Sequence, residues 1–157
     1  MGLMSFFKGV GEKIFGSDVK EAEKTAAPEQ VATLKAGALL KHVQDLGLAY
    51  NKLTVKVADH TVILEGEVAT QEDSEKIGLA VGNVEGVHEV DNNLVVAEPR
   101  PEAKYHTVES GDTLSKIAKE YYGDMMKYPV IFEANKPMLK SPDLIYPGQV
   151  LRIPALD

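Results

Sequence analysis

The sequence contains no cysteine. This absence excludes disulfide bonds, thiolate-ligated zinc and iron–sulfur sites, thiol nucleophiles and CxxC redox motifs. Long hydrophobic runs are also missing, since no stretch approaches the roughly 20 apolar residues of a membrane-spanning helix. Positive charge is scarce: 17 Lys and Arg stand against 24 Asp and Glu, for a formal net charge of −7. This balance disfavours nucleic acid and anionic membranes as partners and favours a small cation.

The length of 157 residues suits one average domain or two small ones. A composition of 44% hydrophobic and 26% charged residues is typical of a globular protein. Residues 1–100 carry 10 Lys and Arg against 16 Asp and Glu, whereas residues 101–157 carry 7 against 8. This break in charge indicates two units with different surfaces.

The apolar N-terminus resembles a targeting segment but does not fit one. No basic region precedes its uncharged run, no small-residue cleavage site follows it, and an aromatic residue stands at the position where myristoylation needs Ser or Thr. We therefore expect a cytoplasmic protein. A short helix packed on its own domain is predicted by an apolar stripe, and a membrane-surface anchor is the alternative. The stripe consists of Leu3, Phe6, Phe7, Val10 and Ile14.

Residues 17–30 are polar and indicate a linker that runs into a helix beginning at Pro28. Apolar residues at helical spacing then continue as far as Gly47, which stops the pattern. The period next changes to two, which predicts a β-hairpin whose turn lies at Asp59 and His60. The first unit therefore opens with a helix and two antiparallel strands.

A second helix follows the hairpin. Thr70 and Asp73 resemble a capping box, and the apolar spacing after them predicts a helix ending near Gly82. Residues 87–96 are typical of a third strand, so two helices would cover one face of a three-stranded sheet. This order, together with the segment at residues 80–87, resembles a BON domain. The stretch at 98–102 is bracketed by prolines and indicates a stiff linker.

The C-terminal third carries more specific motifs. Val108 opens the pattern Val-x-x-Gly-Asp-Thr-Leu, Ala134 and Asn135 follow, and Ile145 opens Ile-x-Pro-Gly-Gln-x-Leu-x-Ile-Pro. Together these motifs resemble a LysM domain over residues 104–154. The resemblance implies a βααβ fold with a shallow groove for N-acetylglucosamine polymers, between the turn at residues 111–114 and the loop before the last strand.

The arrangement of the whole chain resembles the bacterial cytoplasmic potassium-binding proteins of BON–LysM architecture. The similarity rests on an N-terminal Met-Gly-Leu segment, the BON and LysM order, and above all the residues from Asn135 to Pro154. It implies an α+β protein of two small domains, with an N-terminal helix packed on the BON domain. The expected boundaries are an N-terminal helix and linker at 1–27, an αββαβ BON domain at 28–98, a linker at 99–103 and a βααβ LysM domain at 104–157.

Motifs of catalysis are missing from the sequence. The four histidines, at positions 42, 60, 88 and 106, show no HxxxH or HExxH spacing. There is no GxSxG motif, Walker loop or Rossmann fingerprint. We therefore expect a binding protein and not an enzyme.

The predicted end of the second helix suits a monovalent cation. Potassium has low charge density, so neutral carbonyl oxygens can replace its water shell more readily than clustered carboxylates can. A helix C-terminus leaves its last carbonyls without intrahelical partners, at the negative end of the dipole. In the resembled family, main-chain carbonyls of the N-terminal segment and of this turn hold the ion. The resemblance thus implies six main-chain potassium ligands: Phe7, Lys8, Val10, Gly82, Val84 and Val87.

We therefore expect a monomeric sensor of cytoplasmic potassium, acting in osmotic stress, in which the ion orders the N-terminal segment and the contact between the domains. Residues 80–87 could instead form an ordinary glycine-terminated helix and turn. Nucleic acid and membranes are not expected partners. Peptidoglycan is not expected either, because the chain shows no secretion signal and residues 136–143 lengthen the LysM groove loop. A peptidoglycan-binding envelope protein that uses this groove is the alternative function.

Overall fold

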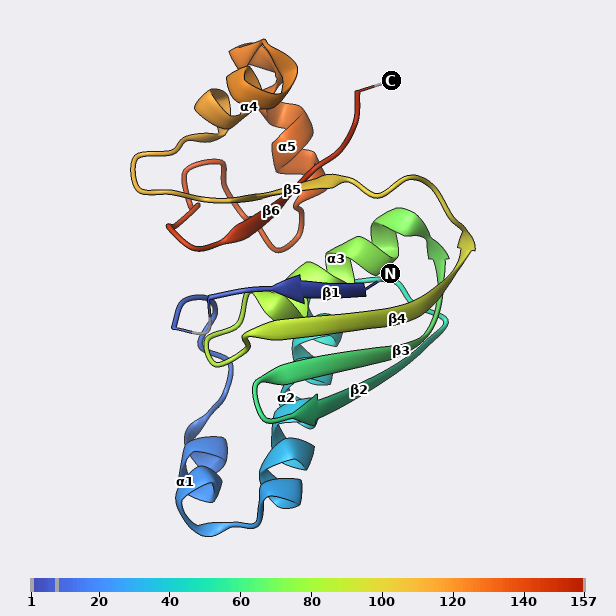
Figure 1. The fold of residues 1–157 in the computed structure, drawn as a ribbon, viewed down its shortest axis with the longest axis vertical. Helices are drawn as coiled ribbons and strands as arrows, with labels where there is room; N and C mark the ends of the chain where they lie inside the picture. The colour runs from blue at the N-terminus through green and yellow to red at the C-terminus, as the bar shows by residue number, and fades with distance from the viewer. Residues whose placement is uncertain (1, 8, 157) are drawn as a thin grey trace. The chain divides into compact units, whose positions relative to one another are not determined.

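The computed structural model describes residues 2–7 and 9–156, and it divides into two compact units, Met1–Arg100 and Pro101–Asp157 (Figure 1). Both units mix helices and strands, which confirms the α+β class. The first unit contains β1 (Gly2–Ser5), α1 (Ser17–Thr25), α2 (Pro28–Asp45), β2 (Lys52–Ala58), β3 (Thr61–Thr70), α3 (Gln71–Gly82) and β4 (Glu89–Glu98). The second contains β5 (Lys104–Thr107), α4 (Leu114–Tyr122), the short 3₁₀ helix η1 (Met125–Lys127), α5 (Tyr128–Ala134) and β6 (Val150–Ile153).

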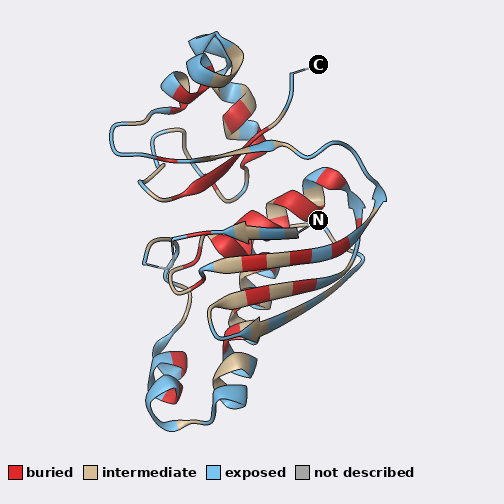
Figure 2. Ribbon diagram, in the orientation of Figure 1, coloured by how far each residue is buried: buried red, intermediate tan, exposed pale blue. Residues whose placement is uncertain are grey.

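The first unit is a four-stranded sheet in the order β1-β4-β3-β2, with α2 and α3 on one of its faces (Figure 1). β3 and β4 run parallel, and the other two pairs are antiparallel. Buried and more exposed positions alternate along the first halves of β3 and β4 (Figure 2). Their inward side chains pack with the apolar stripes of α2 and α3, as strands with one covered face require. The fully buried members include Leu39, Val43, Val62, Leu64 and Ile77.

Local signals set the ends of these elements where the sequence predicts them. Pro28 stands in the first turn of α2, and the hairpin turns at Asp59, which takes a positive φ of 57°. The hydroxyl of Thr70 accepts a hydrogen bond from the Asp73 amide at 3.1 Å and so caps α3, which ends at Gly82. The predicted helix–strand–strand–helix–strand order of α2 to β4 is confirmed.

The prediction of an N-terminal helix is wrong. Gly2–Ser5 forms β1, which pairs antiparallel with β4 so that Leu3 lies opposite Asp91. The Phe6 side chain is 4% exposed, whereas those of Leu3 and Phe7 are 64% and 59% exposed. The apolar residues therefore follow the two-residue period of a strand. An isolated helix this short is marginal in water, while the edge of β4 offers unpaired backbone groups.

The prediction of a polar linker at residues 17–30 is also wrong. Ser17–Thr25 forms α1, which packs on α2 through the buried side chains of Val19 and Ala22. The ion pair between Glu23 and Lys35, at 3.2 Å, joins the two helices. Only two buried residues mark the inner face of α1, so its apolar stripe is too narrow to stand out in the sequence.

The second unit has the predicted βααβ order, with a two-stranded antiparallel sheet of β5 and β6. Thr113 caps α4 by accepting from the Lys116 amide at 3.1 Å, and Gly123 ends the helix in the left-handed conformation. The Asn135 side chain ties the end of α5 to β6, because it donates to the carbonyls of Ile131 and Arg152 and accepts from the Arg152 amide. No helix in the described part of either unit is long and apolar enough to cross a membrane.

Candidate functional site

Two segments far apart in the sequence meet beside the C-terminus of α3. We name them the N-terminal loop (residue 7 and residues 9–11) and the α3–β4 turn (residues 83–88). At one end the Phe6 amide donates to the His88 carbonyl at 2.6 Å. At the other end the Glu12 amide donates to the Asn83 carbonyl at 2.9 Å, and the Glu85 amide donates to the Glu12 carbonyl at 3.0 Å. These bonds hold the loop against the turn at both ends.

Glycines allow the close approach of the two segments. A Cβ atom on Gly82 would lie 2.1 Å from Cζ of Phe6, so the ring occupies the space that any other residue would fill. A Cβ on Gly11, whose φ is +118°, would lie 2.6 Å from the Asn83 carbonyl oxygen. Both contacts are shorter than van der Waals separation, so a side chain at either position would push the segments apart. The sequence identifies Gly82 as a helix end but gives no signal for its contact with Phe6.

The hydrogen bonds that the amides of the turn donate show where its carbonyl groups point. In a planar trans peptide the N–H and C=O groups point in opposite directions. The Asn83 amide donates back to Leu79 at 2.9 Å, so the Gly82 carbonyl points out of the end of α3. The His88 amide donates to His60 at 2.8 Å, so the Val87 carbonyl points away from the β2–β3 turn.

The structure places Phe7 and Val10 on the N-terminal loop, Val84 and Val87 on the α3–β4 turn, and Gly82 at the last residue of α3. The sixth predicted ligand, Lys8, lies outside the described residues. The oxygens of Phe7 and Val84 each accept one amide, from Val10 at 3.2 Å and from Val87 at 3.0 Å, which leaves each a second lone pair. Within residues 2–7 and 9–156, no backbone amide donates to the oxygens of Val10, Gly82 or Val87. Carbonyl oxygens with free lone pairs can bind a cation.

The described residues form no cluster of carboxylate or imidazole side chains of the kind that binds divalent metal ions. In the described ranges no three His, Asp or Glu side chains gather in a way that could hold a metal ion. The donors near the end of α3 are neutral backbone oxygens, supported by the negative end of the helix dipole. This chemistry suits a weakly hydrated monovalent cation better than a divalent one.

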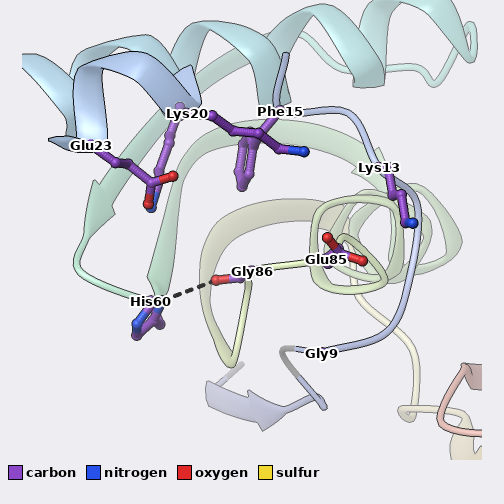
Figure 3. A pocket seen from close by; sticks show the side chains of 9 residues that line it. Gly9, Lys13, Phe15, Lys20, Glu23, His60, Glu85 and Gly86 are labelled. Carbon is purple, nitrogen blue, oxygen red and sulfur yellow. Dashed lines mark hydrogen bonds and ion pairs between the residues drawn. The ribbon is translucent and has the colours of Figure 1, made fainter. Parts of the chain in front are cut away.

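A pocket of about 540 Å³ lies beside the α3–β4 turn (Figure 3). The β2–β3 turn closes one wall, where His60 Nδ1 lies 3.1 Å from the Gly86 carbonyl oxygen. The Glu23–Lys35 ion pair stands on the wall formed by the helices. The sequence gives no sign of this pocket because it depends on α1. Its lining residues are Gly9, Lys13, Phe15, Lys20, Glu23, Lys35, His60, Glu85 and Gly86.

The second unit has a groove of about 420 Å³ where the resemblance to LysM domains places one. The Asp112 carboxylate is fixed beside it, accepting from the Glu109 amide at 2.9 Å and contacting His106 Nε2 at 2.8 Å. The backbone hydrogen bond from Glu109, and then the contact with His106, hold the pKa of Asp112 below its usual value. The groove is lined by Asp112, Thr113, Leu114, Ser115, Tyr128, Pro142, Asp143 and Ile145.

Comparison with known proteins agrees with both units. Residues 30–98 match the BON domain family, and residues 106–154 match the LysM domain family. The chain is 43% identical over 155 residues to the potassium binding protein Kbp of Escherichia coli O6:H1, covering 98% of this chain and 99% of that protein. The chain belongs to the Kbp family.

A second relative is an uncharacterized protein of Deinococcus radiodurans, 40% identical over 131 residues, which cover 76% of this chain and 51% of that protein. The BON match begins at residue 30, whereas the similarity to Kbp extends over nearly the whole chain. In this chain, β1, the N-terminal loop and α1 therefore lie outside the matched BON region. The predicted resemblance to BON–LysM proteins is confirmed.

Proposed function

We propose that this protein binds potassium selectively in the cytoplasm and acts as a sensor of its concentration. The observation that carries the proposal is the clamping of the N-terminal loop against the α3–β4 turn, which gathers backbone oxygens beside a helix C-terminus. Membership of the Kbp family supports the choice of ion, because the relative from Escherichia coli is named for potassium binding.

The proposed ligands are the main-chain oxygens of Phe7, Lys8, Val10, Gly82, Val84 and Val87. Their dipoles replace the water shell of a potassium ion without adding negative charge. Mg²⁺ releases its water reluctantly and demands a small octahedral site, so a set of neutral carbonyls does not compensate the free energy that Mg²⁺ loses on dehydration. The donor type therefore favours potassium over Mg²⁺.

The sensing step in this proposal is the ordering of the N-terminal loop. β1 pairs with β4 over only four residues. The loop after it is held by the contact between Phe6 and Gly82 and by three backbone hydrogen bonds. Segments with so few buried contacts open more readily than a core does. An ion that takes ligands from both segments closes the loop and favours the closed population. No catalytic step is part of this proposal, since BON and LysM domains are binding modules.

Calorimetry tests the proposed function. Potassium, rubidium, sodium, magnesium and calcium chlorides are titrated into the full chain at equal ionic strength, with a choline chloride background. We expect saturable heat for potassium and rubidium, and none for sodium or the divalent ions at the same concentrations. Equal binding of sodium and potassium would reduce the effect to general screening of an acidic protein and contradict the proposal.

The proposal extends to the two domains, whose mutual contact we expect the ion to strengthen. Small-angle scattering checks this expectation: saturating potassium should narrow the distance distribution, while an equal concentration of sodium should leave it unchanged. An identical distribution in both salts would limit the response to the first unit.

The polar groove of the second unit supports the alternative of peptidoglycan binding. A pull-down with purified peptidoglycan separates the two functions, using Thr113→Ala as the groove variant. The envelope function would be favoured if peptidoglycan captured the wild type but not the Thr113→Ala variant, and if the wild type also showed no response to potassium.

A further inference from the structure

His60 is in contact with the α3–β4 turn although 26 residues separate it from Gly86. It follows Asp59 in the sharp turn between β2 and β3. Its carbonyl oxygen accepts the amides of His88 at 2.8 Å and Glu89 at 3.2 Å. Its ring lies with Nδ1 at 3.1 Å from the Gly86 oxygen, as the dashed line in Figure 3 shows. One residue thus contacts both ends of the segment that contains Val87.

These contacts fix two successive peptide groups. The Gly86–Val87 peptide is held at its oxygen by the His60 ring and at its N–H by the Val84 oxygen, at 3.0 Å. The Val87–His88 peptide is held at its N–H by the His60 carbonyl. The Val87 oxygen belongs to this second peptide and points to the opposite side.

The ring bond restrains the position where the turn is most free to move. Gly86 has a φ of +101°, a conformation that glycine adopts without strain but can leave easily. A carbonyl oxygen only accepts hydrogen bonds, so in this contact the Nδ1–H group of His60 is the donor and the Gly86 oxygen is the acceptor. Loss of this donor would let the Gly86–Val87 peptide rotate and carry the Val87 carbonyl with it.

We propose that His60 is a positioning residue of the potassium site, whose Nδ1–H donor aims the Val87 carbonyl through the Gly86–Val87 peptide. The inference rests on the proposed function for its effect on affinity. His60 itself does not touch the ion. Its contribution is to order the turn before the ion arrives, so that binding does not have to supply that ordering.

The test compares variants that differ in the donor. His60→Leu and His60→Ala remove it, whereas His60→Asn keeps an amide N–H close to the position of Nδ1. Asp59→Asn is the control for the neighbouring charge, because Asn tolerates the positive φ of that position and the change removes only the carboxylate that lies 3.6 Å from His60 Nε2, leaving the Nδ1 donor in place. Potassium affinity is measured by calorimetry on the full chain, and amide exchange of Val87 and His88 is measured in potassium-free buffer.

We expect His60→Leu and His60→Ala to weaken potassium binding about tenfold, equivalent to about 1.4 kcal/mol. His60→Asn and Asp59→Asn should stay within about threefold of the wild type. The Val87 and His88 amides should exchange faster in the two donor-free variants. Either wild-type affinity in both of these variants, or equal losses in His60→Asn and His60→Leu, would overturn the inference.

Failure of the proposed function would look different. If the wild type binds no potassium, that function is wrong, and amide exchange alone then decides whether His60 orders the turn. Unchanged exchange at Val87 and His88 in the donor-free variants would contradict that role as well.

Discussion

Gly82 has no side chain, and the ring of Phe6 occupies the space that a side chain there would need. The Phe6 ring is 4% exposed and fills the space in front of the Gly82 Cα, at the last turn of α3. Phe6 lies in the chain between β1 and the N-terminal loop, and its ring packs on the end of α3. The closeness of the two segments therefore depends on a packing contact as well as on backbone hydrogen bonds.

Gly82→Ala is expected to weaken potassium binding and lower the stability of the first unit by about 1–3 kcal/mol, because the new methyl group would overlap the Phe6 ring. Gly37→Ala is the matched control, since nothing lies within 4 Å of the added Cβ there. At that helical position alanine should be neutral or stabilising, by up to about 1 kcal/mol. Urea unfolding and potassium calorimetry check both variants, and equal behaviour of the two would contradict the packing argument.

Asp112 gives the second unit a defined response to acid. Its pKa is lowered in the folded protein by the Glu109 amide and by His106. A carboxylate with a depressed folded pKa stabilises the protein above its unfolded pKa, and that stabilisation disappears as the pH falls through the folded value. Asp112→Asn should therefore lose stability at pH 7 and show a flatter pH dependence below about pH 4 than the wild type. Unfolding curves between neutral and acidic pH measure this; parallel curves for the two proteins would argue against it.

At the scale of elements, the N-terminal segment is an addition to a complete BON core. The buried stripes of α2, α3, β3 and β4 pack on one another. Among residues 3–7 and 9–12, whose burial the structure describes, only Phe6 is buried. β1 extends the sheet at the edge of β4. We therefore expect the main core to stay closed when this segment is removed.

Deletion of residues 1–12 should abolish potassium binding while both domains stay folded, because three of the six proposed ligands and the closing hydrogen bonds would be lost. A potassium titration of the truncated chain gives the result, and circular dichroism verifies its fold. Wild-type affinity after the deletion would show that the site lies elsewhere.

At the scale of the whole molecule, a ligand that binds only the folded state raises the melting temperature with its concentration. Potassium and rubidium should therefore raise the melting temperature in proportion to the logarithm of concentration above the dissociation constant. Sodium at the same ionic strength should produce only the small shift expected from screening of the −7 net charge. Scanning calorimetry in the three chlorides measures the difference, and identical shifts would argue for screening alone.

The sequence by itself determined those parts of the fold that depend on neighbours along the chain. The periods of apolar residues located α2, the hairpin, α3 and β4, and the Thr70 and Thr113 caps marked where two helices begin. The motifs of the second unit indicated its βααβ order. Such signals are local, since a cap acts within one helical turn and a strand shows its buried face every second residue.

Only the tertiary structure decided the secondary structure of Gly2–Ser5 and of Ser17–Thr25. Gly2–Ser5 is a strand because the edge of β4, nearly ninety residues later, supplies its partners, and Ser17–Thr25 is a helix because α2 covers its narrow apolar face. The Phe6–Gly82 contact and the His60–Gly86 hydrogen bond likewise join positions that share no sequence pattern. Backbone groups at a sheet edge and space beside a glycine are properties of the folded surface, so the sequence could suggest the ligand-bearing segments but not how they are held together.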